Sequence, residues 1–365
     1  MRDIGQPPVL AVDVMGSDRG PGEILEGVRR ALNTRTTVPF RVILVGDGET
    51  IRSAIGERGF RSVVRRVEIF HAAEVIGMEE SPTKALRQKK HASMAQAVEL
   101  VKEGRADGAL SCGNTGALVA LGTIRLRPME GLDRPTLATV IPAIDRHFVL
   151  LDVGANPAPT ARQMVHSAIL GSHYSSVALR TPSPQIGLLS IGTEEGKGNG
   201  LVQEVHETLK LLASKQIINY RGLIEGFQLF QAPADGSSVD VVVCDGFVGN
   251  VLLKAMESIA KRLKTFLRKE LMRNPFRAFG CLFLGGALRN IRMKLNAERY
   301  GAAPLLGLKG SIFKAHGASN CREICHAVLI AQRFLRAGMD EELHRQVLQA
   351  QELLRSAEER PPENF

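Results

Sequence analysis

Five apolar, strand-like runs of this chain end in glycine and small polar residues. The segments that follow these runs are 15–18, 113–116, 154–156, 192–199 and 245–250. Glycine lets a ligand approach the backbone closely, and the helix that usually follows such a strand offers free N–H groups to an anion. Ligands of open parallel sheets bind beyond the carboxyl ends of the strands. The repeated pattern therefore predicts one crevice, built from several strand ends, that can hold an anionic group.

One of these segments carries a lysine among glycines. Lys197 lies within Gly-Thr-Glu-Glu-Gly-Lys-Gly-Asn (192–199), directly after a predicted strand. This is not a Walker A phosphate loop, because Gly198 follows the lysine where Ser or Thr would be required. A lysine in a surface loop is often only solvated. The surrounding glycines and the neighbouring Asn199 favour a role in ligand binding.

Polar residues of the other segments each have a structural alternative. Asn250 follows the apolar run 239–243, and its amide either caps the next helix or holds a carbonyl or phosphate oxygen. Asp13 is interpreted as a turn-forming residue unless it lies in the crevice. His316 follows a short strand-like run and either acts in the crevice or is solvated. No set of carboxylates or histidines has the spacing of a metal site.

The elements that must position these residues alternate between strands and helices. This order predicts a mainly parallel sheet with helices on both faces. The runs 136–141 and 148–152 are predicted to pair as antiparallel strands, and Ser93 is expected to be a helix N-cap. Helices are expected at 21–32, 93–102, 116–126, 160–179 and 200–213.

The excess positive charge of the chain is localised. The net charge is +9, and residues 251–300 contain twelve Lys/Arg and three Asp/Glu, which accounts for the whole excess. Apolar residues recur every three or four positions over 251–271, which predicts an amphipathic basic helix in a protruding helical hairpin. Its apolar face packs on the core or on a second subunit, or else contacts a membrane surface or an acidic partner. The predicted contact residues are Lys261, Lys264, Arg268 and Arg273.

Composition favours a cytoplasmic protein. The five cysteines show no disulfide framework, which is typical of a reducing compartment. The first residues contain no apolar core of a secretory signal, and no apolar run reaches the 18 residues of a spanning helix. Any contact with a membrane is therefore expected to be peripheral.

Six motifs occur together in an order typical of one enzyme family. They are Ala-Val-Asp-Val-Met-Gly (11–16), Ser-Cys-Gly-Asn-Thr-Gly-Ala (111–117), Leu-Leu-Asp-Val-Gly-Ala-Asn (150–156), Ile-Gly-Thr-Glu-Glu-Gly-Lys-Gly-Asn (191–199), Val-Val-Cys-Asp-Gly-Phe-Val-Gly-Asn (242–250), and Ala-Pro-Leu-Leu-Gly (303–307) with Ala-His-Gly (315–317). Over roughly 8–335 the chain resembles the bacterial phosphate acyltransferases of phospholipid synthesis. It departs from their pattern at Ser17, where the family usually has glycine, and the tail beyond about 340 matches nothing in that pattern.

The resemblance implies both a fold and a reaction. The fold is an α/β, three-layer α/β/α domain of the isocitrate/isopropylmalate dehydrogenase class over 8–340, followed by a C-terminal extension, 341–365, that is frayed at its end. The reaction transfers a fatty acyl group from acyl-[acyl carrier protein] to inorganic phosphate and gives acyl phosphate for phosphatidic acid and phospholipid synthesis, without a cofactor or a metal. The resemblance also implies a cytoplasmic homodimer, loosely attached to the membrane, that supplies a membrane glycerol-3-phosphate acyltransferase and binds no nucleic acid.

The residue types fit this reaction. Phosphate that attacks a thioester must be held and aimed, and the developing oxyanion requires hydrogen-bond donors. Lys197 and Asn250 are therefore predicted to be catalytic. The predicted substrate- and phosphate-binding residues are Asp13, Gly16, Asn114, Thr115, Asn156, Glu194, Asn199, Asp245 and His316.

Three other functions are compatible with parts of the pattern. A phosphate acetyl- or butyryltransferase that uses acyl-CoA would share the fold and the nucleophile, but it would not need a basic docking helix. A metal- and NAD-dependent decarboxylating dehydrogenase would need clustered metal-binding aspartates, which the sequence does not display. A non-catalytic module that binds lipid or carrier protein would need only the basic hairpin.

Overall fold

A computed structural model describes residues 6–35, 39–57, 59–143, 146–231, 238–274, 276–277, 279, 286, 301–337 and 341–358. The strands are β1 (Val9–Asp13), β2 (Arg41–Gly46), β3 (Val67–His71), β4 (Gly108–Ser111), β5 (Thr136–Pro142), β6 (His147–Leu151), β7 (Gln185–Leu189), β8 (Asn219–Ile224), β9 (Val241–Val243), β10 (Ala303–Leu306) and β11 (Ser311–Lys314). The helices are α1 (Pro21–Asn33), α2 (Gly48–Glu57), α3 (Pro82–Gln88), α4 (Ser93–Lys102), α5 (Thr115–Leu121), α6 (Ala161–Tyr174), α7 (Gly200–Ser214), α8 (Gly246–Leu271), α11 (Cys321–Ala337) and α12 (Glu341–Glu358).

These described strands form one eleven-stranded sheet in the order β3-β2-β1-β4-β11-β10-β5-β6-β9-β7-β8. The first five strands run parallel to one another, and the last four also run parallel to one another. Three antiparallel pairings through β10 and β5 lie between these blocks, so the blocks run in opposite directions. The mainly parallel sheet and the antiparallel β5–β6 pair are confirmed. The strand ends that we expect to form one crevice therefore lie in two rows, one for each block.

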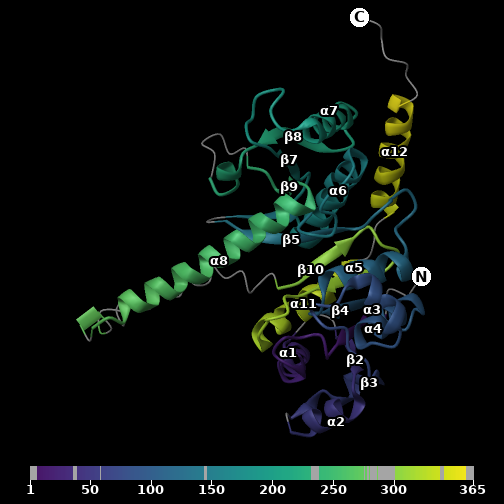
Figure 1. Ribbon diagram of the computed structural model, residues 1–365, viewed down its shortest axis with the longest axis vertical. Coiled ribbons are helices and arrows are strands. Elements are labelled where there is room, and N and C mark those ends of the chain that lie inside the picture. Colours follow the sequence, from purple (N-terminus) through teal and green to yellow (C-terminus); the bar gives the residue numbers. More distant parts are fainter. Residues whose placement is uncertain are drawn as a thin grey trace, which may run out of the picture.

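Helices cover both faces of the sheet, because successive strand residues point to opposite sides. In β1, Val9 and Ala11 belong to the core cluster that contains α4 side chains, whereas Leu10 and Val12 belong to the one that contains α1 and α11 side chains. In β6, Val149 packs in a third cluster with α6 and α7. Figure 1 shows α6, α7 and α12 grouped about the second block and α1 to α4 about the first. The expected three-layer α/β/α fold is therefore confirmed.

The expected helices are present, with one correction at a cap. The range 116–126 comprises α5 and a π-helical continuation, η3 (Gly122–Leu126), and 160–179 comprises α6 and a similar continuation, η4 (Ser175–Leu179). Ser93 is not the N-cap of α4, because Ala92 occupies that position. The Ser93 N–H donates to the Glu74 carbonyl at 2.9 Å, which already holds Ser93 in the first turn.

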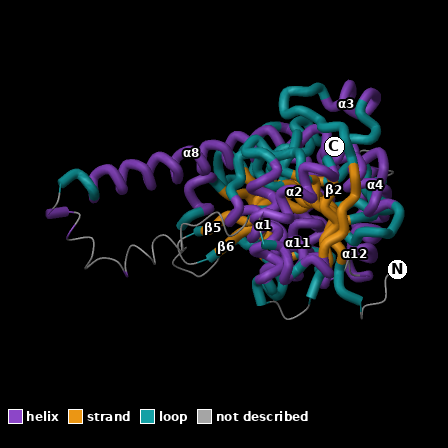
Figure 2. The backbone as a smooth tube through the Cα atoms, turned by 90° about the horizontal axis from the view of Figure 1, so that it is seen from below, coloured by secondary structure: helices purple, strands orange, loops and turns teal. Residues whose placement is uncertain are grey.

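The helix α8 projects from the body of the molecule (Figures 1 and 2). Leu252, Leu253 and Met256 pack on the core near its start. Farther along, Ile259 and Phe266 are 66% and 61% exposed. The possibility that the whole apolar face of the helix packs on the core is therefore wrong for the described part. The second arm of the expected hairpin, with Arg289, Arg292 and Lys294, lies outside the described residues.

The C-terminal segment forms α12, which lies against α6. Leu343, Val347 and Ala350 of α12 are buried, and Gln351 donates to the Gly131 carbonyl. The extension that the sequence predicts over 341–365 therefore begins as a docked helix. Its expected frayed end, from 359 onward, lies outside the described residues.

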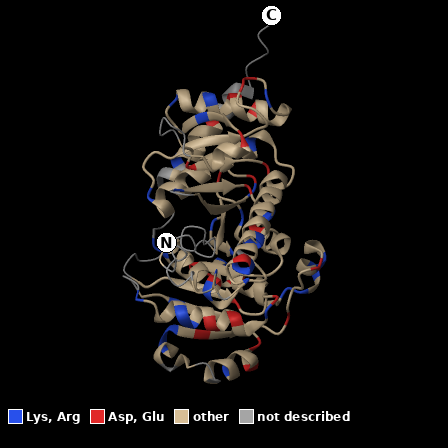
Figure 3. Ribbon diagram, turned by 90° about the vertical axis from the view of Figure 1, so that its left-hand side faces the viewer, with Lys and Arg blue, Asp and Glu red and all other residues tan. Residues whose placement is uncertain are grey.

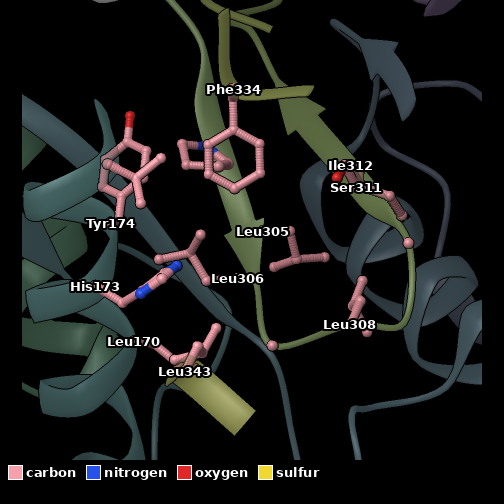
Figure 4. A pocket seen from close by; sticks show the side chains of 14 residues that line it. Leu170, His173, Tyr174, Leu305, Leu306, Leu308, Ser311, Ile312, Phe334 and Leu343 are labelled. Carbon is pink, nitrogen blue, oxygen red and sulfur yellow. The ribbon is translucent and has the colours of Figure 1, made fainter. Parts of the chain in front are cut away.

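An apolar pocket lies where α6, α11 and α12 meet the β10–β11 turn. Figure 4 shows Leu170, Tyr174, Leu306, Phe334 and Leu343 around it. Its lining is mostly aliphatic and includes none of the predicted site residues. We interpret the pocket as a junction of packed elements, because it offers few groups that could hold an anion.

A buried histidine of α6 gives the stability of the fold a pH dependence. His166 is 2% exposed, and burial, followed by the charge of Arg162, lowers its pKa from 6.5 to about 4. The unfolded chain therefore takes up this proton at a higher pH than the folded chain does. The contribution of neutral His166 is complete above pH 6.5 and is lost as the pH falls from 6.5 towards 4.

We expect His166 to account for about 3 kcal/mol of the unfolding free energy lost between pH 7 and pH 4. His166→Gln should flatten this dependence, as measured by urea unfolding across that range. His91→Gln, at an exposed position, is the matched control and should leave the slope unchanged. A full slope in His166→Gln would assign the acid sensitivity to other groups.

Candidate active site

The loop after β1 is held together by a buried carboxylate. Asp13 is 1% exposed, and burial raises its pKa. Its two oxygens accept from the Ser111 hydroxyl at 2.7 Å and the Met15 N–H at 3.2 Å. A Cβ on Gly16 would lie 3.0 Å from the Gly113 nitrogen, so the loops after β1 and β4 approach each other closely. Asp13 therefore shapes the loop, while Gly16 permits the close approach.

The loop after β4 is tied to a distant segment by Asn114. This side chain accepts from the Ala117 N–H at 3.0 Å and so caps α5. Its amide nitrogen also donates to the carbonyls of Met78 and Glu80, at 2.8 and 3.0 Å. Thr115, the first residue of α5, is partly buried. Since protein groups already occupy the Asn114 amide, its present geometry is that of a positioning residue.

The end of β11 joins these two loops and contains a lysine that we did not predict. Lys314 donates to the carbonyls of Cys112, at 3.2 Å, and Ala315. Desolvation lowers its pKa to about 8. His316 is exposed, and its Nδ1 accepts from the Ala318 N–H at 3.1 Å, which leaves Nε2 to carry the proton of the neutral ring. The sequence Lys-Ala-His-Gly (314–317) could have indicated Lys314, but our prediction included only its histidine.

A second group of residues lies after β6 and β9. Asp152 accepts from the N–H groups of Gly154, Ala155 and Asn156 at 3.0, 2.9 and 2.7 Å. Asn156 is buried and donates from its side chain to the Pro135 carbonyl at 2.8 Å. The loop after β6 is therefore rigidly closed upon itself, and the Asn156 amide contributes to that closure.

Asn250 lies in the first turns of α8, facing this loop. The N-cap of α8 is Asp245, whose carboxylate accepts from the N–H groups of Phe247 and Val248 at 3.0 and 2.8 Å. Of the two roles considered for Asn250, the capping role is therefore excluded. Its amide nitrogen donates to the Val153 carbonyl at 3.2 Å, and a Cβ on Gly154 would lie only 2.5 Å from that nitrogen. One further N–H of this exposed amide can reach a ligand.

The third group is the loop between β7 and α7. Lys197 is exposed, and its methylene chain folds over Gly192, where a Cβ would lie 2.9 Å from the Lys197 Cγ. The same Cβ would lie 2.7 Å from the Glu194 carboxylate, so both side chains converge over that glycine. Asn199 accepts from the Val202 N–H at 2.9 Å and caps α7. The lysine is thus the basic side chain that this loop presents, and Asn199 has a capping role.

Sheet topology relates the second and third groups. The strands β6, β9 and β7 are parallel neighbours, with β9 in the middle. Since neighbouring strands lie about 4.8 Å apart, the loops that follow them leave the same edge of the sheet within about 10 Å of one another. The loops of Asn156 and Lys197 and the start of α8, which contains Asn250, therefore lie side by side at one edge of the sheet.

The loops after β1, β4 and β11 lie near the loop after β6 where α8 begins. The strands β4 and β9 are separated by five steps in the sheet, which a twist of about 20–25° per step converts into a rotation of roughly 100°. The charge of Lys254, on α8, acts on both Lys314 and His316. The two rows of strand ends therefore approach each other beside the start of α8.

Neither a metal centre nor an ionised thiol is formed by the described residues. They contain no group of three His, Cys, Asp or Glu side chains arranged to hold a metal. Burial raises the pKa of the Cys112 thiol to about 12 and raises that of Cys244 as well. Both cysteines are therefore protonated at neutral pH and are poor nucleophiles.

The fold is shared with phosphotransacylases. A phosphotransacetylase from Streptococcus pyogenes has a TM-score of 0.61 and 17% identity, with 91% of this chain and 94% of that chain covered. A branched-chain phosphotransacylase from Enterococcus faecalis has a TM-score of 0.54 and 17% identity, with 89% and 98% covered. At this identity the likeness defines the fold alone, and it places the chain in a structural class that includes acyl-transferring proteins.

Sequence similarity then defines the family. The family described as "Fatty acid synthesis protein" matches residues 9–342. A phosphate acyltransferase from Desulfitobacterium hafniense is 39% identical over 338 residues, which cover 93% of this chain and 97% of the relative. One from Thermoanaerobacter pseudethanolicus is 39% identical over 326 residues, with 89% and 93% covered. The chain belongs to the phosphate acyltransferase family and is an acyltransferase, as its motifs indicated.

Proposed function

We propose that this enzyme transfers a fatty acyl group from acyl-[acyl carrier protein] to inorganic phosphate and releases acyl phosphate and the free carrier. Membership of the phosphate acyltransferase family supports phosphate as the acceptor in phospholipid synthesis. The observation that carries the proposal is the common sheet edge from which the loop of Lys197 and the helix α8, with Asn250 in its first turns, emerge. This arrangement brings a lysine side chain and an amide donor to one region, which suits a thioester carbonyl that becomes an oxyanion.

The proposed mechanism uses phosphate itself as the nucleophile. A phosphate oxygen attacks the thioester carbon, and the carbonyl oxygen of the resulting tetrahedral intermediate takes the negative charge. Lys197 and the free N–H of Asn250 stabilise that oxygen. The C–S bond then breaks, and the thiolate of the carrier leaves and takes up a proton. No enzyme thiol is required, in keeping with the raised pKa of Cys112 and Cys244.

The direct test is an assay for acyl phosphate formed from acyl-[acyl carrier protein] and labelled phosphate. We expect label in the acyl phosphate and stoichiometric release of the free carrier. Acyl-CoA is the comparison substrate, and much faster turnover with acyl-CoA would overturn the choice of donor. Absence of acyl phosphate with either donor would overturn the proposed reaction.

We propose that α8 is the contact surface for the carrier protein and for anionic lipid. Its described part carries Lys261, Arg268 and the adjoining Arg273 in exposed positions beside the exposed Ile259 and Phe266, and Figure 3 marks Lys and Arg in blue. Such a pattern suits an acidic protein or the surface of a bilayer. The backbone of Lys264 belongs to α8, but its side chain lies outside the described part.

This surface supports a peripheral mode of membrane contact. Among the helices in the described ranges, none has both the length and the apolar character needed to cross a bilayer. We therefore propose a cytoplasmic homodimer that touches the membrane at α8 and passes acyl phosphate to a membrane glycerol-3-phosphate acyltransferase. Co-purification with that partner and sedimentation of the free enzyme test these two assignments.

Neutralising the basic face of α8 is expected to weaken binding. Replacing Lys261, Arg262, Arg268 and Lys269 by Gln should reduce binding to carrier protein and to vesicles with anionic lipid by about tenfold at low salt, and by less at about 0.5 M salt, because salt screens exposed charges. Co-sedimentation and titration calorimetry measure the two affinities. The matched control replaces four exposed basic residues of the body: Arg52, Arg65, Lys215 and Arg221. Equal losses in both variants would make the effect one of net charge alone.

A further inference from the structure

Three basic side chains lie near enough to affect one another's charge at the end of β11 and on α8. Lys314 is the last residue of β11, His316 follows it by two residues, and Lys254 comes from α8. Burial is the main cause that lowers the pKa of Lys314 and of His316, and the charge of Lys254 lowers both pKa values further. The charge of Lys314 also lowers the pKa of His316. The three residues, here called the basic triad, are therefore close enough to repel one another.

The ammonium group of Lys314 has donor capacity to spare. Its direct partners are the carbonyls of Cys112 and Ala315, which use two of its three hydrogens. Asp13 and Asp18 act on it only as more distant charges, and the Asp13 oxygens already accept from other groups. A lysine that is largely removed from water and hydrogen-bonded only to carbonyl groups is strongly stabilised when an anion binds beside it.

The other two members of the triad are also only partly neutralised. Lys254 is paired with Glu257 at 3.1 Å, on the exposed surface of α8. The negative charges of Glu257 and Glu323 raise the pKa of His316. Burial and the charges of the two lysines lower it by more, so the net result is a lowered pKa. His316 also presents Nε2 as a donor, because its Nδ1 accepts from the Ala318 N–H. The triad thus offers two ammonium groups and an imidazole N–H.

We propose that the basic triad binds the phosphate that attacks the thioester, while Lys197 and Asn250 act on the carbonyl oxygen. Phosphate is small, carries up to two negative charges at neutral pH, and can accept hydrogen bonds from several directions, so it suits donors that come from two different elements. This assignment rests on the proposed acyl transfer for the fate of the bound phosphate. The binding step itself does not depend on that reaction.

Phosphate groups could reach the triad from two sources: inorganic phosphate, or the phosphopantetheine arm of a carrier protein. The triad lies at the end of β11, whereas the basic residues suited to a docked carrier lie farther along α8. We assign inorganic phosphate to the triad for this reason. Binding of free phosphopantetheine forms the second arm of the experiment.

The test measures binding and kinetics in Lys314→Gln. We expect the affinity for inorganic phosphate, measured by titration calorimetry without an acyl donor, to fall about tenfold or more. KM for phosphate should rise by a similar factor, while KM for the acyl donor should change little. Lys309→Gln is the matched control, because Lys309 is an exposed lysine just before the other end of β11. It should bind phosphate as the unmodified enzyme does.

A second variant guards against misfolding, because Lys314 is poorly solvated. His316→Gln changes an exposed side chain, and we expect it to raise KM for phosphate severalfold. Unchanged phosphate affinity in both variants would overturn the proposal, and a selective loss of phosphopantetheine binding would overturn the choice of inorganic phosphate. If the unmodified enzyme forms no acyl phosphate but Lys314→Gln still loses phosphate binding, the binding site is upheld and the proposed reaction is rejected.

Discussion

Replacing Lys197 by alanine is expected to reduce acyl phosphate formation at least about a hundredfold, as the loss of an oxyanion donor does in other enzymes. The structural reason is that this exposed lysine belongs to a loop that leaves the sheet at the same edge at which α8, the helix of Asn250, begins. Its methylene groups rest on Gly192, so their removal exposes little buried surface. We therefore expect the loss in kcat with a thermal midpoint within about 2 °C of the unmodified enzyme.

Two comparisons separate catalysis from a general effect of charge. Lys215→Ala removes an exposed lysine just beyond α7 and should leave the rate unchanged. Lys197→Arg retains the charge but changes the donor geometry, and we expect it to recover only part of the rate. Unmodified turnover by Lys197→Ala would remove this residue from the mechanism and leave Asn250 as the remaining proposed donor of that site.

The local parts of this site could be predicted from the sequence. Glycine and small polar residues at strand ends are local signals, and the loops after β1, β4, β6, β7 and β9 occur where those signals stand. The start of α8 was also encoded locally. Asp245 precedes Gly246 and caps the helix through the Phe247 and Val248 N–H groups. Asparagine and aspartate are about equally good N-caps, so residue type alone did not choose Asp245 over Asn250.

The relations between distant segments could not be predicted in the same way. The two blocks run in opposite directions because three antiparallel pairings separate them, and two of these involve β10, which comes far along the chain. Lys314 owes its environment to the carbonyl of Cys112, 202 positions away in the sequence. Likewise, the amphipathic pattern of 251–271 predicted a helix but could not indicate what covers its apolar face. Such features depend on tertiary pairing, which residue spacing alone does not specify.

Replacing Gly249 by alanine is expected to disrupt the contact on which Asn250 depends. A Cβ at this position would lie 1.9 Å from the Asp152 carbonyl oxygen and 2.9 Å from the Cys244 Sγ. Neither neighbour can move freely, because Asp152 donates its N–H to the Cys244 carbonyl at 3.0 Å while its carboxylate closes the loop after β6. The first turn of α8 must therefore shift away from β6, at a cost of about 3 kcal/mol in unfolding free energy.

The same shift moves the Asn250 amide, and a displacement of about 1 Å at a catalytic donor lowers the rate about a hundredfold. Urea unfolding and the acyl phosphate assay measure the two effects separately. Gly200→Ala is the matched control, because Gly200 also begins a helix but a Cβ added there would meet no atom within 4 Å. It should keep both stability and rate, since alanine is the better helix former. If Gly249→Ala behaved like Gly200→Ala, the start of α8 would have to be loosely packed, and its contact with the β6 loop could not be what orients Asn250.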